Sequence, residues 1–276
     1  MAVSLLPGSA AQAQGHLLCR TFPLPEGGDL NHLLLGSLHL HNDGGEEAAC
    51  PLPPTGGVTL LFPTDGEAVL CGPLSRAHLL HLTPGETVYG VRLRWDGGEW
   101  LWNGGLAQLT DCTVPLEPLL PGSNRMGGAL ERCASPQEQN ALVSRLLTLR
   151  GARQYRSTPL LRRCLSLIAE RSGLVRVAEL AEELGCSERY LNRLLRQKIG
   201  LSTKTVCEIV QFHQAAQVLL REQPRSLLHT AVACGYFDQA HMNRRCRQLL
   251  RQSASHIRDL APTPAGEALR VLLELK

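Results

Sequence analysis

The chain has 276 residues, of which 43% are hydrophobic and 19% charged, the composition of a globular protein with room for two domains. It has no uncharged apolar run of about eighteen residues and no basic-then-apolar start. We therefore expect neither a membrane span nor a signal peptide, and a location in the cytoplasm. Its 10 cysteines occur singly, without a Cys-x-x-Cys pair, which predicts reduced and mostly buried thiols rather than a metal cluster.

Charge is distributed unevenly along the chain. Residues 159–260 contain 16 Lys and Arg against 9 Asp and Glu, a net charge of +7, whereas residues 1–158 contain 10 against 14, a net charge of −4. A basic half favours a polyanionic partner for that half, because each phosphate that it neutralises releases counterions. The count alone leaves open a pair of ordinary domains with unequal charge.

The region from about 16 to 130 consists of short apolar or alternating runs cut by Gly, Pro, Asn and Asp. The runs are LLLGSLHLH, GVTLLFP, EAVLCG, HLLHL, TVYGVRLRW and EWLWNG. Alternation divides the first run into two faces, with Leu34, Gly36, Leu38 and Leu40 on one and His39 and His41 on the other. We predict a β-rich domain over residues 1–134, closed as a sandwich or barrel.

A helix is predicted over 136–150. Ser135 can cap it, Pro136 suits its first position, and Glu138 can reach back to the cap. Leu142, Leu146 and Leu149 then recur at helical spacing, which fits either a dimer contact or packing against the β-rich domain. The polar stretch after it completes a helix and linker segment over 135–158, with the interdomain hinge at 151–158.

One layout occurs twice in the basic half. VAELAEELG at 177–185 precedes a helix starting at Ser187, and LLHTAVACG at 227–235 precedes a helix starting at Asp238. In both copies an alanine lies four residues before the closing glycine. The small residue lets two helices cross closely, and glycine accepts a positive φ at the turn. The pattern predicts two helix-turn-helix units.

The second helix of each unit has an apolar and a polar face. We expect Tyr190, Leu191, Leu194 and Leu195 to be buried in the first, and Met242, Cys246 and Leu249 in the second. The polar faces carry residue types that read base edges or hold phosphates. The predicted DNA-binding residues are Glu188, Arg189, Asn192, Arg193, Arg196, Gln239, His241, Asn243, Arg244 and Arg247.

A long helix is predicted between the two units. Residues 202–222 contain neither Gly nor Pro and carry apolar residues at helical intervals. Twenty-one residues span about 31 Å, close to the roughly 34 Å of one duplex turn. The two reading helices are therefore expected to enter successive major grooves on one side of DNA.

The second unit resembles a known family. GYFDQAH at 235–241, followed by Asn243 and Arg244, is similar to the G-[FY]-x-[DS]-Q-[SA]-H-F-x-R signature of AraC-type bacterial regulators. Phe212, Ala215, Leu219 and Leu220 also match that family's linking helix. The resemblance implies a double helix-turn-helix DNA-binding domain over 159–262, followed by a tail at 263–276.

The chain departs from the family pattern in several places. Met242 and Cys246 stand where aromatics are usual, and Gln211 stands where an arginine is common. The closing motif appears as RQSASHIR at 251–258, without the usual Gly and Pro. We therefore expect a less aromatic core and an altered last turn.

Residues 90–118 are similar to the sensor region of one AraC subgroup, which implies a cupin-like N-terminal module. The resemblance as a whole implies a sequence-specific transcription regulator that is not an enzyme and needs no cofactor. Its expected partner is double-stranded DNA, joined by a small-molecule effector, RNA polymerase and a second copy of the chain. No membrane partner is expected.

Two enzymatic functions are alternatives to this interpretation. His39, His41 and Glu46 fit the H-x-H-x4-E spacing of a metal-dependent cupin enzyme with an accessory DNA-binding domain, but no later motif provides a fourth ligand. Alternating histidines on a strand can also be surface residues, so we predict no metal site. A DNA repair methyltransferase would need clustered zinc cysteines and a Pro-Cys-His-Arg site, and the sequence contains neither.

Overall fold

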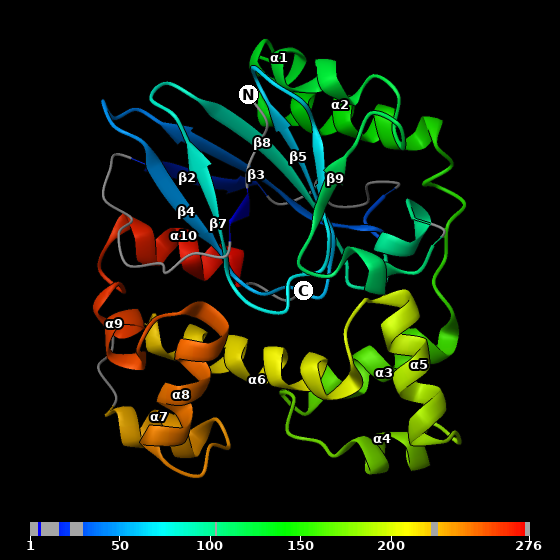
Figure 1. Cartoon of the computed structure of the whole chain (residues 1–276), viewed down its shortest axis with the longest axis vertical. Helices are drawn as coiled ribbons and strands as arrows, with labels where there is room; N and C mark the ends of the chain where they lie inside the picture. Colours follow the sequence, from blue (N-terminus) through cyan, green and yellow to red (C-terminus); the bar gives the residue numbers. More distant parts are fainter. Residues whose placement is uncertain (1–4, 7–16, 23–29, 103, 222–225, 274–276) are drawn as a thin grey trace.

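The computed structural model describes residues 5–6, 17–22, 30–102, 104–221 and 226–273. A β-rich N-terminal domain lies against a helical C-terminal domain, with the long helix α6 (Thr203–Leu219) running along the boundary between them (Figure 1). This arrangement confirms the predicted fold class of a β-rich domain followed by an all-α domain with two helix-turn-helix units.

The N-terminal domain contains two antiparallel sheets, ordered β1-β7-β4 and β2-β3-β8-β5-β6-β9. The strands are β1 Leu5–Leu6, β2 Leu17–Phe22, β3 Leu34–Asn42, β4 Ala48–Leu52, β5 Thr59–Pro63, β6 Val69–Cys71, β7 His78–Leu82, β8 Thr87–Leu93 and β9 Thr113–Pro115. Apolar side chains from β3 and β5 of the larger sheet meet those of β4 and β7 of the smaller one in a shared core. The sheets therefore pack face to face, as in a sandwich.

The predicted alternation along β3 holds over its second half. Leu38 and Leu40 are buried between the sheets, whereas His39 lies on the opposite face, where its ring stacks on Tyr89 at 4.8 Å. Leu34 departs from the prediction, because a bulge between Leu34 and Gly36 shifts the register and places Leu34 in the core on the other side of the sheet.

The run EWLWNG is not a strand, so that prediction was wrong. Its first two residues belong to the one-turn 3-10 helix η1 (Gly98–Trp100), which follows a turn closed by the N–H of Gly97 on the carbonyl of Arg94. A Cβ at Gly98 would lie 2.5 Å from Val58, so the close approach there requires glycine, and the N–H of Leu101 bonds to Gly98 instead of a neighbouring strand.

Helices cover the outer face of the larger sheet. They are η2 Leu106–Leu109, η3 Ser123–Arg125, α1 Met126–Glu131 and α2 Pro136–Leu149. Ser135 caps α2 as predicted, accepting a bond from the Glu138 N–H, while the Glu138 carboxylate reaches the N–H of Ala134. Val143, Leu146 and Leu147 pack into the core beneath the sheet, which favours the packing interpretation of this helix over a dimer contact.

The C-terminal domain is built from helices around one core. They are α3 Pro159–Glu170, α4 Val177–Glu183, α5 Glu188–Lys198, α6 Thr203–Leu219, α7 Leu227–Ala233, α8 Gln239–Leu250, α9 Ala254–Asp259 and α10 Pro264–Leu272. The core includes Phe212, Ala215, Met242 and Cys246, all fully buried. Met and Cys thus fill the positions where the resemblance leads one to expect aromatics.

The last helix, α10, replaces the predicted tail. It packs against β2, and its Leu272 is buried in the core between the two sheets. Arg270 donates a hydrogen bond to the Leu220 carbonyl at 2.8 Å, which ties α10 to the end of α6. The segment is short and its apolar face meets the distant N-terminal domain, so its sequence alone gave no sign of its partner.

The cysteine prediction is confirmed, because all ten thiols are free and six of them are buried. Burial raises the pKa of Cys164 to about 12 and that of Cys19 to about 11, which keeps both protonated. None of the helices in the described part of the chain is long and apolar enough to cross a lipid bilayer.

Candidate nucleic-acid interface

The two predicted helix-turn-helix units are present and share one backbone turn. Gly185 and Gly235 have φ values of +64° and +72°, which a side chain would disfavour. The next N–H in each unit, from Cys186 and Tyr236, bonds to the carbonyl of the predicted crossing alanine at 2.9 Å. Unit 1 is hereafter α4–α5, and unit 2 is α7–α8.

Both reading helices begin at the predicted residue. The Ser187 hydroxyl accepts a hydrogen bond from the Tyr190 N–H at 3.2 Å, and the Asp238 carboxylate accepts one from the His241 N–H at 2.5 Å. Each cap satisfies one of the first free N–H groups of its helix. The caps therefore fix where the exposed faces of α5 and α8 start.

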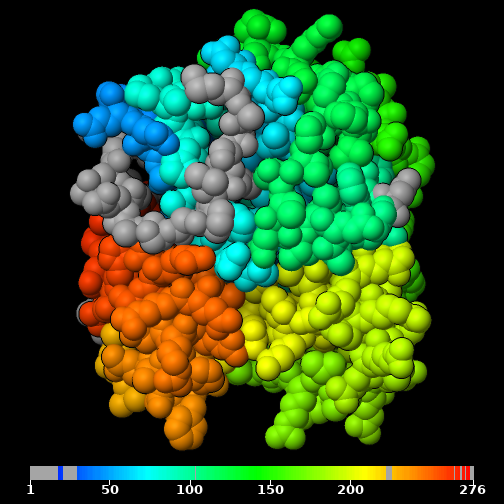
Figure 2. Space-filling model, in the orientation of Figure 1, coloured from blue at the N-terminus to red at the C-terminus, as the bar shows by residue number. Residues whose placement is uncertain are grey.

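Arginines stand at matching positions on the two reading helices. Arg193 and Arg196 of α5 correspond to Arg244 and Arg247 of α8, each pair being 51 positions apart like the two caps, and all four are exposed. Glu188, Arg189 and Gln239 are exposed as well. The two units form two lobes below the N-terminal domain (Figure 2). The exposed face of α5 borders that domain, because Arg189, Arg193 and Arg196 line a hollow together with Gly104 and Gln108.

Two asparagines among the predicted DNA-binding residues bind the helix that follows. Asn192 accepts a hydrogen bond from the N–H of Thr203, the first residue of α6, at 3.2 Å, and Asn243 accepts one from the N–H of Ala254, the first residue of α9, at 2.9 Å. Both lie 11 residues from their partner. Each asparagine therefore ties its reading helix to the start of the following helix, a role that the sequence pattern did not indicate.

His241 is half-buried rather than fully outside. Its ring lies 5.3 Å from that of Tyr236 in an edge arrangement, and its Nδ1 accepts a bond from the Phe237 N–H at 3.4 Å. His241 thus helps to fix the turn before α8.

Tyr190 corrects the prediction in the opposite direction. It was expected in the core, but 41% of it is exposed, and the Arg193 guanidinium lies 5.4 Å from the centre of its ring. Leu191 and Leu195 have no exposed surface, whereas Leu194, also predicted in the core, is only partly buried. A tyrosine can lie at such a boundary because one end of its ring is apolar and the other polar.

Lys204 is a basic residue that the sequence analysis missed. With Arg189 and Arg196 it lines an open groove of about 410 Å³ between α5 and the start of α6. Three cations against one carboxylate, Glu188, give the groove a net positive charge that suits a phosphate better than a neutral group. The sequence did contain a signal for it, because Lys204 is the second residue of the helix that begins after the cap Ser202, close to the end of α5.

Helix α6 is shorter than predicted. It has 17 residues, begins after its cap Ser202 and ends at Leu219, while the predicted end at 222 lies outside the described residues. Its length is about 26 Å at 1.5 Å per residue. Because this is less than one duplex turn, the length of α6 by itself does not match the spacing of successive major grooves.

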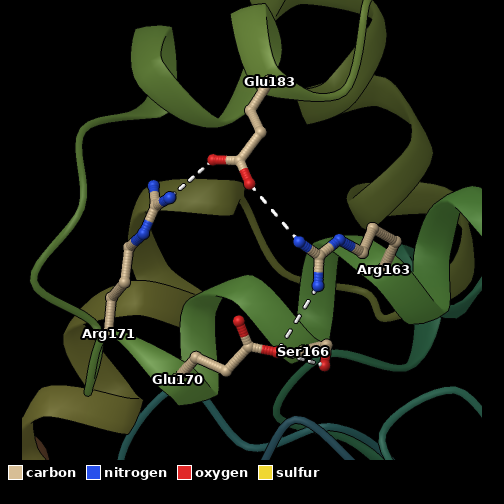
Figure 3. Close-up of polar contacts among 5 residues, drawn as sticks. All are labelled: Arg163, Ser166, Glu170, Arg171 and Glu183. Atoms are coloured by element: carbon tan, nitrogen blue, oxygen red, sulfur yellow. Dashed lines mark hydrogen bonds and ion pairs between the residues drawn. The ribbon is translucent and has the colours of Figure 1, made fainter.

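An ion-pair network holds α4 against α3 in unit 1 (Figure 3). Glu183 of α4 binds Arg171 at 2.5 Å and Arg163 at 3.4 Å, and both arginines come from α3 or its end. Arg163 also pairs with Glu170, which accepts a bond from Ser166. The residues are largely exposed, so the network orients α4 more than it stabilises the fold.

Unit 2 is attached differently. Arg245 of α8 makes two hydrogen bonds to Glu208 of α6, at 2.7 and 3.2 Å, and both side chains are mostly buried. Gln211, which stands where the family has an arginine, donates to the Cys234 carbonyl at 2.9 Å. The linking helix thus binds both helices of unit 2.

A family model for a helix-turn-helix domain matches residues 180–259. These residues form a helix-turn-helix domain of the AraC type. No curated protein matches the chain.

Solved structures of AraC-type proteins are similar to parts or most of the chain. A transcriptional regulator with an AraC-type DNA-binding domain from Chromobacterium violaceum is 22% identical over 38% of this chain and 95% of its own, with a TM-score of 0.36. A ligand-free ToxT variant from Vibrio cholerae is 9% identical over 91% and 99%, with a TM-score of 0.49. ToxT with a bound unsaturated fatty acid is 11% identical over 89% and 95%, with a TM-score of 0.45.

The altered closing motif of the AraC-type domain still makes its turn. Arg251 takes the left-handed conformation with φ +61°, and Ser253 caps α9 by accepting the N–H of His256. The last turn therefore differs from the family pattern only in that an arginine takes a backbone conformation that usually favours glycine.

The AraC-type domain is fastened to the N-terminal domain at the ends of both reading helices. Lys198 of α5 forms an ion pair with Glu99, and Thr110 donates to the Gly200 carbonyl at 2.8 Å. The Ala77 N–H bonds to the carbonyl of Leu249 in α8 at 2.6 Å. A movement of the N-terminal domain would therefore act directly on both reading helices.

The predicted hinge at 151–158 is pinned to the N-terminal domain. Tyr155 donates to the Asp96 carbonyl at 2.8 Å, and Ser157 donates to the Asp96 carboxylate at 2.6 Å. Burial, followed by the charges of Glu99 and Asp96, raises the pKa of Tyr155, so its hydroxyl stays a donor.

A cavity of about 490 Å³ opens where the linker, the N-terminal domain and α3 and α6 meet. Arg94, Arg156 and Arg162 line it, and α6 contributes the apolar side chains Val206 and Val210. Such a mixture of apolar walls and a few polar groups is typical of small-molecule sites.

The histidines of the cupin-enzyme alternative have protein partners. His39 stacks on Tyr89, and His41 Nδ1 lies 2.8 Å from the Thr87 hydroxyl, while Glu46 is exposed. Within the described ranges, no three His, Cys, Asp or Glu side chains are grouped as metal ligands.

Proposed function

We propose that the chain is a sequence-specific DNA-binding transcription regulator that responds to a small molecule, and not an enzyme. The observation that carries the proposal is the matched pair of exposed arginines on α5 and α8, Arg193 with Arg244 and Arg196 with Arg247. Helices of this type place their exposed N-terminal residues in the major groove while the preceding helix crosses the backbone.

The ten predicted DNA-binding residues divide into roles. Arg189 and Gln239 lie in the first turns of their helices, where side chains reach base edges, and Arg196 and Arg247 lie further along, where phosphates are within reach. Asn192 and Asn243 already hold the next helix, so their part in DNA binding is to keep the reading helices oriented.

The response to a small molecule is proposed from the cavity at the domain junction. Its three arginines outnumber its one carboxylate, Asp96, which favours an organic acid, and its apolar wall favours a ligand with a hydrophobic body. A ligand there touches the linker, α3 and α6 together, and so can shift DNA affinity if it binds one arrangement of the domains better than another. Contact with RNA polymerase and self-association stay predictions.

Selection of bound fragments from a random DNA pool, with the purified full chain, tests DNA recognition. We expect one enriched sequence with two half-sites, and an affinity that falls steeply with salt. Arg189→Ala or Gln239→Ala should relax preference at one position, at a cost of about 1–3 kcal/mol. Arg196→Ala or Arg247→Ala should weaken all sequences evenly and flatten the salt slope. No enrichment, or four variants that bind like the wild type, would contradict the proposal.

The ligand response is tested separately with an unsaturated fatty acid as the first probe, such as oleate. Binding is expected to raise the Tm and to change affinity for the selected DNA. Arg162→Met should weaken both effects, since Arg162 lines the cavity, while Arg221→Met, at an exposed position just after α6, serves as the matched control. Equal effects in the two variants would place the ligand elsewhere.

A further inference from the structure

Phe237 is 90% exposed, an unusual state for so large an apolar side chain. It lies in the turn between α7 and α8, directly before Asp238, the cap of the reading helix of unit 2. Its exposure calls for a reason that the fold itself does not supply.

A packing role in capping the helix does not account for it. A hydrophobic residue directly before a cap often packs on the fourth residue of the helix, which in α8 is Met242. Met242 has no exposed surface, while Phe237 remains almost fully exposed, so the two do not pack as such a pair.

Unit 1 shows that the turn works without this residue. One residue, Cys186, separates Gly185 from its cap, whereas Tyr236 and Phe237 separate Gly235 from Asp238. Cys186 is partly buried against the domain core, and Tyr236 is 4% exposed. Tyr236 therefore fills the core in unit 2, and Phe237 is the additional residue.

The local structure holds Phe237 beside the start of the reading helix. Its N–H donates to His241 Nδ1, and the His241 ring in turn lies edge-on against the buried Tyr236. Gln239 and Ala240, the first two residues of α8, are exposed next to it. Phe237 is thus continuous with the proposed DNA-reading surface of unit 2.

The chemistry of the major groove then selects one target. A phenyl ring cannot bond to the donors and acceptors of base edges, and the one apolar group that a base presents in the major groove is the C5-methyl of thymine. We propose that Phe237 contacts a thymine methyl in the half-site read by unit 2. This inference rests on the proposed function.

The test replaces each thymine of the selected DNA site in turn with uracil, which lacks only the methyl group. At the position that Phe237 touches, the wild-type affinity should fall about fourfold, the effect of one lost methyl contact. Phe237→Ala should bind the thymine and uracil duplexes equally at that position and keep the wild-type ratio at every other one.

Matched variants separate this contact from other effects. Leu228→Ala removes another exposed apolar side chain, 57% exposed on α7, and should keep all wild-type ratios. Phe237→Leu should retain part of the methyl preference. An unchanged ratio at every thymine in Phe237→Ala would overturn the inference, whether or not total affinity falls. Failure of the wild type to select any sequence would overturn the proposed function instead.

Discussion

The two helix-turn-helix units share one frame and differ in how that frame is held. A left-handed glycine, a cap and an asparagine bonded to the next helix recur in both. Unit 1 is fastened to the N-terminal domain by Lys198 and Gly200, whereas unit 2 is fastened to that domain by Leu249 and to α6 by Arg245. Position 194 of unit 1, which matches Arg245, carries a leucine.

The difference shows which features a helix-turn-helix unit requires and which can vary. The backbone turn and the caps satisfy the polar groups of the helix ends, a requirement common to both units. The attachments decide what can move each reading helix. Unit 1 therefore depends directly on the N-terminal domain, and unit 2 depends on both that domain and the linking helix.

The largest effect is expected where unit 1 meets the N-terminal domain. Gly200 has φ +88°, and a Cβ there would lie 2.8 Å from the Leu106 carbonyl oxygen. Gly200→Ala should lower the free energy of unfolding by about 4 kcal/mol through backbone strain and overpacking together. Urea denaturation measures this loss.

The matched control for Gly200 is Arg251, which occupies the corresponding turn of unit 2 and already carries a side chain at φ +61°. Arg251→Ala should change the free energy of unfolding by less than about 0.5 kcal/mol. Equal losses for the two variants would mean that the two turns are held alike, against the comparison drawn above.

The next largest effect concerns His213 on α6, the helix that links the two units. His213 of α6 is fully buried, and its Nε2 lies 2.7 Å from the Pro54 carbonyl. Burial lowers its pKa to about 4, the hydrogen bond to Pro54 opposes this shift, and Arg92 adds to it. The unfolded chain therefore binds a proton more readily than the folded one between pH 6.5 and 4, so stability falls as pH falls through that range.

The loss from His213 should be on the order of 3 kcal/mol between pH 6.5 and 4. His213→Gln keeps a side-chain donor for Pro54 but does not titrate. Thermal unfolding of both proteins across this range gives the contribution of His213 as the difference between their pH slopes. Identical slopes would show that His213 is not the group responsible.

Local features of the double unit could be predicted from sequence because they depend on neighbouring residues. The caps Ser187 and Asp238, the turn glycines and the buried faces of α6 and α8 follow from spacing within one or two helical turns. The strands β3, β5, β6, β7 and β8 follow from alternation or short apolar runs in the same way.

Features that depend on distant partners could not be predicted. The burial of Leu272 needs the two sheets, and the bonds of Asn192 and Asn243 need the start of the following helix. Tyr190 was misplaced because helical spacing alone does not tell a core position from a boundary one. Periodicity gives the face of a helix, whereas the partner of that face comes only from the fold.

A smaller effect is expected from the ion pair of unit 2. Arg245→Leu leaves Glu208 mostly buried beside Lys204, whose Nζ is 3.9 Å away, so the loss should be about 2 kcal/mol rather than that of a fully buried charge. Replacing both partners, Glu208→Leu with Arg245→Leu, should restore most of the stability, because no mostly buried charge is then left without its partner. A double variant less stable than Arg245→Leu would show that the Glu208–Arg245 ion pair has a role beyond holding α8 in place.

The smallest expected effect is a gain. Arg251 adopts the left-handed conformation that Gly200 adopts at the matching position of unit 1. Arg251→Gly should relieve the strain of a side chain there and raise the free energy of unfolding by about 1 kcal/mol. Because Arg251 is exposed and cationic, its loss should also lower DNA affinity slightly and without sequence preference. A gain in stability together with a loss of salt-dependent affinity would indicate that Arg251 strains the turn of unit 2 but adds a positive charge near DNA. A loss of stability would show instead that the Arg251 side chain stabilises the turn.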